Sequence, residues 1–95
     1  MNKYEAMCII RPDLSEEARK GVLAQINEAV TKRQGNVLSA SIWAERRKLF
    51  FPIKKHMEGV YYLMNFTAPT EAIKELRHAY KLNEDILRVL ITRAQ

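Results

Sequence analysis

Residues that cross-link a fold or interrupt its helices and strands are scarce in this sequence. It has one cysteine, three glycines and three prolines among 95 residues. The single thiol, Cys8, cannot form an internal disulfide, and no cluster of cysteine and histidine has the spacing of a zinc site. No linker, low-complexity tract or internal repeat interrupts the chain. We therefore expect one domain over residues 1–95, in a reducing, cytosol-like compartment.

Long apolar runs are missing as well. No stretch approaches the roughly 18 consecutive apolar residues of a membrane-spanning helix, and the N-terminus lacks the apolar region of a signal peptide. We therefore expect a soluble, cytoplasmic protein. The composition, 47% hydrophobic and 28% charged, is typical of a folded domain near the lower size limit for a core without staples.

The residues of a catalytic or metal site are missing too. His56 and His78 lie far apart and belong to no recognised motif, and the three glycines are too scattered to form an anion-binding loop. Cys8 lies in a predicted strand, where a small core residue is the expected role. We expect no enzyme activity, no metal and no cofactor.

Positive charge is concentrated in the middle of the chain. Residues 36–60 hold five basic groups against two acidic ones, whereas the flanking segments are each nearly balanced. All five basic groups fall in residues 43–56, the basic–aromatic segment, together with three aromatic rings and one proline. Clustered positive potential suits a nucleic-acid backbone. A solvated basic hairpin end is the alternative that charge alone leaves open.

Two periodicities alternate along the chain, beginning with a strand and a helix. Residues 4–10 form a short β-compatible apolar run that Pro12 ends. Ser15 has the position of an N-cap, and apolar residues recur at helical spacing over residues 18–30. Gly35 is expected in the left-handed position that closes the helix.

The middle of the chain predicts two more strands. Residues 37–43 form a strand, and residues 49–51 are its expected continuation beyond the basic triplet. Pro52 indicates an edge strand, because proline cannot donate a ladder hydrogen bond. Residues 54–59 are the expected turn, and residues 60–66 have the strongest strand composition of the chain.

A second helix and a last strand complete the pattern. Thr70 is the expected N-cap of a helix whose apolar face includes Ile73, Leu76 and Tyr80, and residues 86–93 form the final strand. With right-handed crossovers, the order β-α-β-β-α-β predicts an α+β, ferredoxin-like sandwich. Such a sandwich has a four-stranded antiparallel sheet with two helices on one face.

The sheet face opposite the helices is expected to be partly covered. Strand 60–66 places Tyr62, Met64 and Phe66 on one side and Tyr61 and Leu63 on the other, so both sides are apolar. A half-solvated strand normally alternates more cleanly. We interpret this as an open face or an edge covered by a partner; singly exposed apolar residues are the alternative.

Several stretches of the chain also resemble one known family. They are Tyr4-Glu5 with Ile9–Leu14, the arginine-rich run Arg46–Lys55, the strand Tyr61–Phe66, and Asn83–Arg88. In this order, over nearly the whole chain, they are similar to the family of the sixth protein of the bacterial small ribosomal subunit. Two positions differ from its usual pattern: Ala44-Glu45 stands where a glycine is usual, and Phe50-Phe51 where Ala-Tyr is usual.

The resemblance implies a structural role in assembly. Members of the family bind the central domain of small-subunit rRNA cooperatively with a small basic ribosomal protein, the eighteenth of the set. The candidate RNA-binding residues are Arg46, Arg47, Lys48, Lys54, Lys55, Arg88, Arg93 and Lys3. The candidate partner-binding residues are Trp43, Phe50 and Phe51. The run Leu49–Pro52 is interpreted as core and partner-facing edge, and a core position is preferred over base stacking for each of the three rings.

Two other functions stay open as alternatives. A stand-alone RNA-recognition module has the same topology, but residues 58–62 match its basic-Gly-aromatic consensus only in Gly59 and the rings. A regulatory or ligand-binding domain of this topology would use its sheet face to bind itself or a small molecule. Such a domain would dimerise alone and show little salt-dependent RNA affinity.

Overall fold

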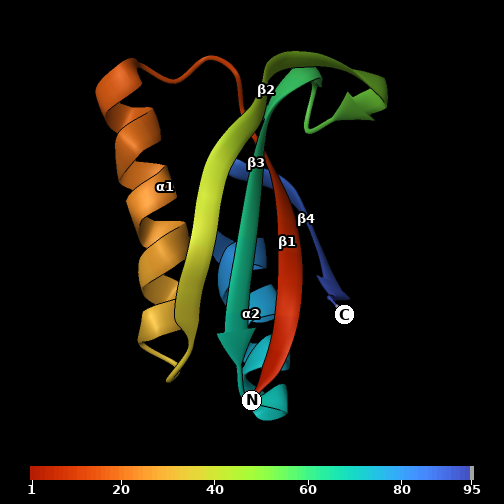
Figure 1. The fold of residues 1–95 in the computed structure, drawn as a ribbon. Helices are drawn as coiled ribbons and strands as arrows, with labels where there is room; N and C mark the ends of the chain where they lie inside the picture. The colour runs from red at the N-terminus through yellow and green to blue at the C-terminus, as the bar shows by residue number, and fades with distance from the viewer. Residues whose placement is uncertain (95) are drawn as a thin grey trace.

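Four strands and two helices follow one another in the predicted order β-α-β-β-α-β (Figure 1). The computed structural model describes residues 1–94, and its elements are β1 (Asn2–Ile10), α1 (Glu16–Thr31), β2 (Asn36–Ile53), β3 (His56–Ala68), α2 (Thr70–Leu82) and β4 (Ile86–Arg93). The strands form one antiparallel sheet in the order β2-β3-β1-β4, and both helices pack on the same face. This architecture is the predicted ferredoxin-like α+β sandwich.

The main core lies between the helices and the inner face of the two central strands. Alternate residues of a strand point to the same face, so Cys8 of β1 faces the helices beside its partner Tyr62 of β3. Val22, Ile26 and Val30 of α1 are buried against this face, as their helical spacing predicts. Burial raises the pKa of the Cys8 thiol to about 12, and Cys8 is the core residue that the sequence predicts.

The two ends of α1 give one confirmed and one wrong prediction. Ser15 is the N-cap, and its Oγ accepts a hydrogen bond from the Ala18 amide at 3.1 Å. Gly35 does not take the left-handed position; Gln34 does, with a φ of 64°. Gly35 is needed for close approach instead, because a Cβ there would lie 2.7 Å from the Thr67 carbonyl oxygen of β3.

Two further boundaries differ from the sequence prediction. Pro69, not Thr70, is the N-cap residue of α2, and it supplies no side-chain cap. The Thr70 hydroxyl accepts a hydrogen bond from the Asn2 side-chain amide at 2.9 Å, which ties α2 to the start of β1. The turn expected over residues 54–59 contracts to Lys54 and Lys55, because β3 already begins at the first residue after them.

The outer half of the β2–β3 hairpin bends across the end of the sheet (Figure 1). β2 is an edge strand, as Pro52 predicts, and its register with β3 shifts once between Val37 and Ser39 and three more times beyond Ile42. The bend buries Leu49 against Ile9 and Leu87, in a second cluster apart from the main core. Part of the apolar surface that we assigned to a partner is therefore covered by the chain itself.

Gly59 leaves the room that this second cluster needs. It is buried on β3, and a Cβ at this position would collide with Cγ2 of Ile9. Its φ is not positive. The glycine is therefore required by the close packing of β3 and β1 and not by an unusual backbone conformation.

The second cluster predicts a specific loss of stability. Leu49→Ala should lower the free energy of unfolding by about 2–3 kcal/mol, because it leaves a cavity against Ile9 and Leu87. Phe50→Ala is the matched control, since its ring is fully exposed and the change should stay within about 0.5 kcal/mol. Urea denaturation measures both variants. Equal losses would contradict the packing of the hairpin on the sheet.

Candidate nucleic-acid interface

The basic residues of the basic–aromatic segment occupy the bent end of the β2–β3 hairpin. Arg46, Arg47 and Lys48 lie on β2, where its register with β3 shifts, and Lys54 and Lys55 form the two-residue turn. All five residues are exposed. The charge cluster of the sequence is therefore also a cluster in space.

Arg47 is held against two aromatic rings. Its guanidinium carbon lies 4.7 Å from the ring centroid of Trp43 and 5.8 Å from that of Tyr61. The two rings lie 5.9 Å apart at an interplanar angle of 59°. A cation over a ring at an exposed site gains about 0.5–1 kcal/mol. The rings thus restrict the orientation of a guanidinium that has five N–H donors to offer.

The two carboxylates of this region are engaged in ion pairs. Glu45 lies 3.3 Å from Arg19 of α1, and Glu58 lies 3.7 Å from Arg46. Exposed pairs of this kind contribute little to stability. Through its pair with Arg19, Glu45 links the irregular part of β2 to α1. Among the described residues, the three lysines of the hairpin end form no ion pair.

The hairpin turn has a backbone that is unfavourable for lysine. Lys54 and Lys55 have φ values of 49° and 71°, and Ile53 pairs with His56 across them. Positive φ at both central residues is the geometry of a type I′ turn, which favours Asn-Gly. For a residue with a side chain, the left-handed conformation costs about 1–2 kcal/mol. Lysine is therefore not the residue that the turn itself favours at either position.

The three aromatic rings of the segment lie at the surface, so the preferred interpretation of each as a core residue is wrong. Trp43 and Phe51 are 52% and 60% exposed, and Phe50 is fully exposed. In the run Leu49–Pro52, which we interpreted as core and partner-facing edge, Leu49 is the residue that is buried. Large exposed rings gathered on one hairpin are typical of a surface that another molecule covers.

The remaining predicted RNA-binding residues divide between the two ends of the sheet. Arg88 of β4 lies close to the hairpin end, where it lines one groove together with Lys54. Lys3 and Arg93 lie near each other at the other end of the sheet. The rise of a β-strand puts them roughly 20 Å from the hairpin end. The structure therefore does not bring Lys3 and Arg93 to the hairpin surface.

The sequence interpretation missed three residues of this surface. Tyr61 contacts Arg47, and Arg77 and Lys81 of α2 line the same groove as Lys54. The i, i+4 spacing of Arg77 and Lys81 puts both on one helix face, which is the signal that the sequence offers. The strand that this face meets depends on how the helix packs.

The open face of the sheet carries a ring on β3, Tyr61, but none on β1, whereas a stand-alone base-stacking module uses rings on both strands. In the described strand β1, Glu5, Met7 and Ile9 face away from the helices and no ring does so. Tyr4 of the same strand is buried against the helices, and so is Tyr62 of β3. Among the described residues, the large exposed rings, Trp43, Phe50 and Phe51, lie on the hairpin instead.

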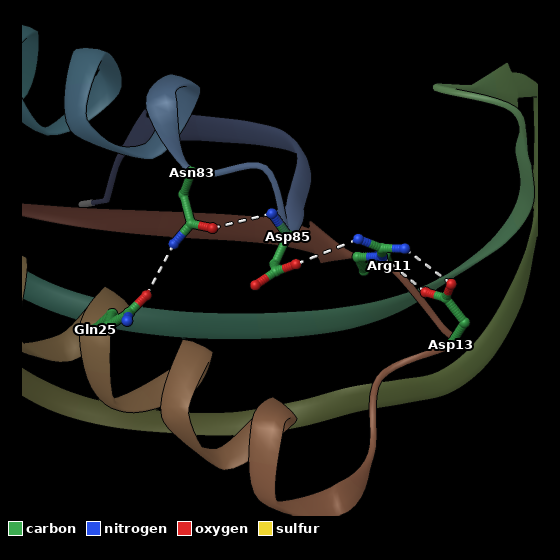
Figure 2. A network of polar contacts seen from close by, with 5 residues as sticks. All are labelled: Arg11, Asp13, Gln25, Asn83 and Asp85. Carbon is green, nitrogen blue, oxygen red and sulfur yellow. Dashed lines mark hydrogen bonds and ion pairs between the residues drawn. The ribbon is translucent and has the colours of Figure 1, made fainter.

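A polar network fixes the loops at the same end of the sheet (Figure 2). Arg11 lies 2.7 Å from Asp13 in the β1–α1 loop and 3.5 Å from Asp85 before β4. Asn83 accepts a hydrogen bond from the Asp85 amide and donates one to Gln25 of α1. The hydrogen bond from Arg11 lowers the pKa of the Asp13 carboxyl below its ordinary value.

Fold and surface together define a class: a small ferredoxin-like α+β protein with an exposed hairpin of basic and aromatic residues. Within residues 1–94, no group of three or more His, Cys, Asp and Glu side chains is arranged to hold a metal ion. None of the helices described is long and apolar enough to cross a membrane.

The family described as Ribosomal protein S6 matches residues 3–93, and the chain belongs to this family. The small ribosomal subunit protein bS6 of Caldanaerobacter subterraneus subsp. tengcongensis is 39% identical over 93 residues, which are 98% of this chain and 97% of that protein. The protein of the same description from Thermoanaerobacter pseudethanolicus is 40% identical over 93 residues, with the same coverage of 98% and 97%. The sequence resemblance to this family is confirmed.

Solved structures agree with the assignment. The crystal structure of 30S ribosomal protein S6 from Thermotoga maritima has a TM-score of 0.89 and 28% identity, covering 98% of this chain and 87% of that one. The predicted location on the small ribosomal subunit in the cytoplasm follows from the family, and a non-catalytic role is consistent with it. The C-terminal domain of MgtC from Mycobacterium tuberculosis, at 10% identity and a TM-score of 0.67, shares the fold alone.

The Arg11–Asp13 pair predicts a pH dependence of stability. The folded-state pKa of Asp13 is lowered, mainly by the Arg11 hydrogen bond. The contribution of Asp13 to the free energy of unfolding is therefore present above the unfolded pKa of about 4 and is lost as the pH falls through the folded pKa. Arg11→Gln should therefore flatten the decline of unfolding free energy below about pH 4. Urea denaturation at several pH values measures this. Lys20→Gln, an exposed charge on α1, is the control, and an equal flattening there would refute the assignment.

Proposed function

We propose that residues 1–95 act as one structural domain that binds the central domain of small-subunit rRNA together with a small basic ribosomal protein, the eighteenth of the set. The observation that supports this most directly is the bent hairpin end, where five basic residues and three exposed rings lie together. Membership of the ribosomal protein S6 family supports it independently.

The arginines and lysines of the hairpin end neutralise phosphates in this proposal. Arg47, oriented by Trp43 and Tyr61, makes the bidentate phosphate contact that a lysine cannot copy. Lys54 and Lys55 project from the turn as point charges. Binding releases counterions from the RNA, so affinity falls as salt rises.

The exposed rings bind the protein partner in this proposal. Phe50 and Phe51 project from an edge strand that the chain does not cover, and Trp43 lies at the margin of the basic patch. Aromatic side chains are enriched among the residues that contribute most to protein interfaces. RNA and partner would thus meet on two sides of one hairpin, and this geometry supports cooperative binding.

Removing the basic triplet should reduce the salt dependence of RNA binding. The triple variant Arg46→Ala, Arg47→Ala, Lys48→Ala should lower the slope of log affinity against log salt by about 0.7–0.9 for each phosphate that it no longer neutralises. Filter binding or fluorescence anisotropy with a central-domain rRNA fragment measures the slope. An unchanged slope would show that the RNA-binding site does not lie on the hairpin.

A second variant separates charge from folding. Lys54→Asn with Lys55→Gly removes two charges but supplies the residues that a type I′ turn prefers. The free energy of unfolding should rise while RNA affinity falls. Weaker binding in a more stable protein cannot be attributed to a damaged fold.

The partner contact can be tested with exposed apolar residues. Phe50→Ala should reduce the gain in RNA affinity that the small basic partner protein gives by about tenfold, the effect of removing an interface anchor worth about 1.4 kcal/mol. Leu82→Ala, which removes an exposed apolar side chain from the end of α2, is the control and should leave the gain unchanged. No partner-dependent gain for the wild-type chain would refute cooperative assembly.

A further inference from the structure

A groove runs along the outer edge of β4, between this strand, α2 and the tip of the hairpin. Its volume is about 460 Å³, and its lining residues are Lys54, Arg77, Tyr80, Lys81, Ile86, Leu87, Arg88 and Val89. Lys54 of the hairpin tip meets the consecutive elements α2 and β4 here, because the packing of Leu49 on the sheet carries the hairpin tip over to β4. The groove is thus a product of the bent hairpin.

The groove has an apolar floor and a positively charged rim. Ile86 and Leu87 are buried and Val89 is half-buried, so they form the floor. The charged lining residues are exposed and all basic: Lys54, Arg77, Lys81 and Arg88. No carboxylate belongs to the lining residues that the structure describes. Four positive charges around an apolar surface form a site for a ligand that is both anionic and partly apolar.

We propose that this groove binds one unstacked nucleotide of an RNA, with its base against the floor and the adjoining phosphates on the rim. This inference rests on the proposed RNA-binding function and extends it to α2, whose Arg77 and Lys81 become RNA-binding residues. Lys54 belongs to both the groove and the hairpin end, so one RNA strand reaches the groove directly from the hairpin phosphates.

A nucleotide fits the site better than an added strand of a protein partner. The volume lies within the range of about 300–1,000 Å³ that is usual for small-molecule sites. The Arg77 guanidinium donates a 3.2 Å hydrogen bond to the Ile91 carbonyl, and so occupies a β4 backbone acceptor. A peptide that adds a strand to a sheet edge depends on such free backbone groups. RNA with unstacked bases needs only the apolar floor and the cations.

The test uses the full chain and the same central-domain rRNA fragment. The double variant Arg77→Gln, Lys81→Gln should lower the salt slope of RNA binding by about 1.4–1.8, because two phosphates are no longer neutralised. Lys74→Gln, on the same helix but outside the groove, is the matched control and should leave the slope unchanged. Lys81→Gln alone keeps the Arg77–Ile91 hydrogen bond and should lower the slope by about 0.7–0.9.

A second measurement tests the apolar floor. Methyl groups of Ile86, Leu87 and Val89 should change chemical shift when the rRNA fragment is added, and inorganic phosphate alone should not reproduce the change. If the groove variants keep the wild-type salt slope while the hairpin triple variant binds RNA more weakly, the groove does not bind RNA. The proposed function is then unaffected. No RNA binding by the wild-type chain, even with the small basic partner protein present, overturns both. If the groove variants lose partner binding but keep their RNA affinity, the groove binds a protein segment, and the proposal that it binds a nucleotide is refuted.

Discussion

The burial of Leu49 against Ile9 and Leu87 holds the outer half of the β2–β3 hairpin over the end of the sheet. A two-stranded hairpin that projects alone into water is marginally stable at best. Gly59 makes the contact feasible, because a side chain at this position would occupy the space of Ile9. The position of the charged and aromatic surface therefore depends on one small apolar cluster outside the main core.

This cluster separates the hairpin into an inward and an outward set of side chains. Leu49 points to the sheet, while Phe50 and the basic residues face solvent, where they are free to meet a partner. Arg47 against its two rings and Glu45 against Arg19 restrict the irregular part of β2 further. A surface restricted in this way loses less conformational entropy on binding than a flexible basic loop would.

The fold was largely predictable, because the strong periodicities of the long elements agree with the final packing. The errors lie at element ends, where tertiary contacts override local preference. Gly35 is used for close approach to β3 while Gln34 takes the left-handed conformation, and Thr70 bonds to Asn2 instead of capping α2. Both positions have the residue types that local rules favour, so the sequence alone could not reveal that distant contacts assign them other roles.

The sequence by itself determined the element order, the inner faces of the helices, and the concentration of charge and rings in residues 43–56. These features depend on neighbours three or four residues apart, or on alternation within one strand. Only the tertiary structure decided that the rings are exposed and that Lys54 meets Arg77 and Lys81 at one groove, while Lys3 and Arg93 lie apart. The groove joins residues tens of positions apart and exists only because the hairpin bends onto the sheet, whereas the register of β1 with β4 sets the position of Lys3 and Arg93.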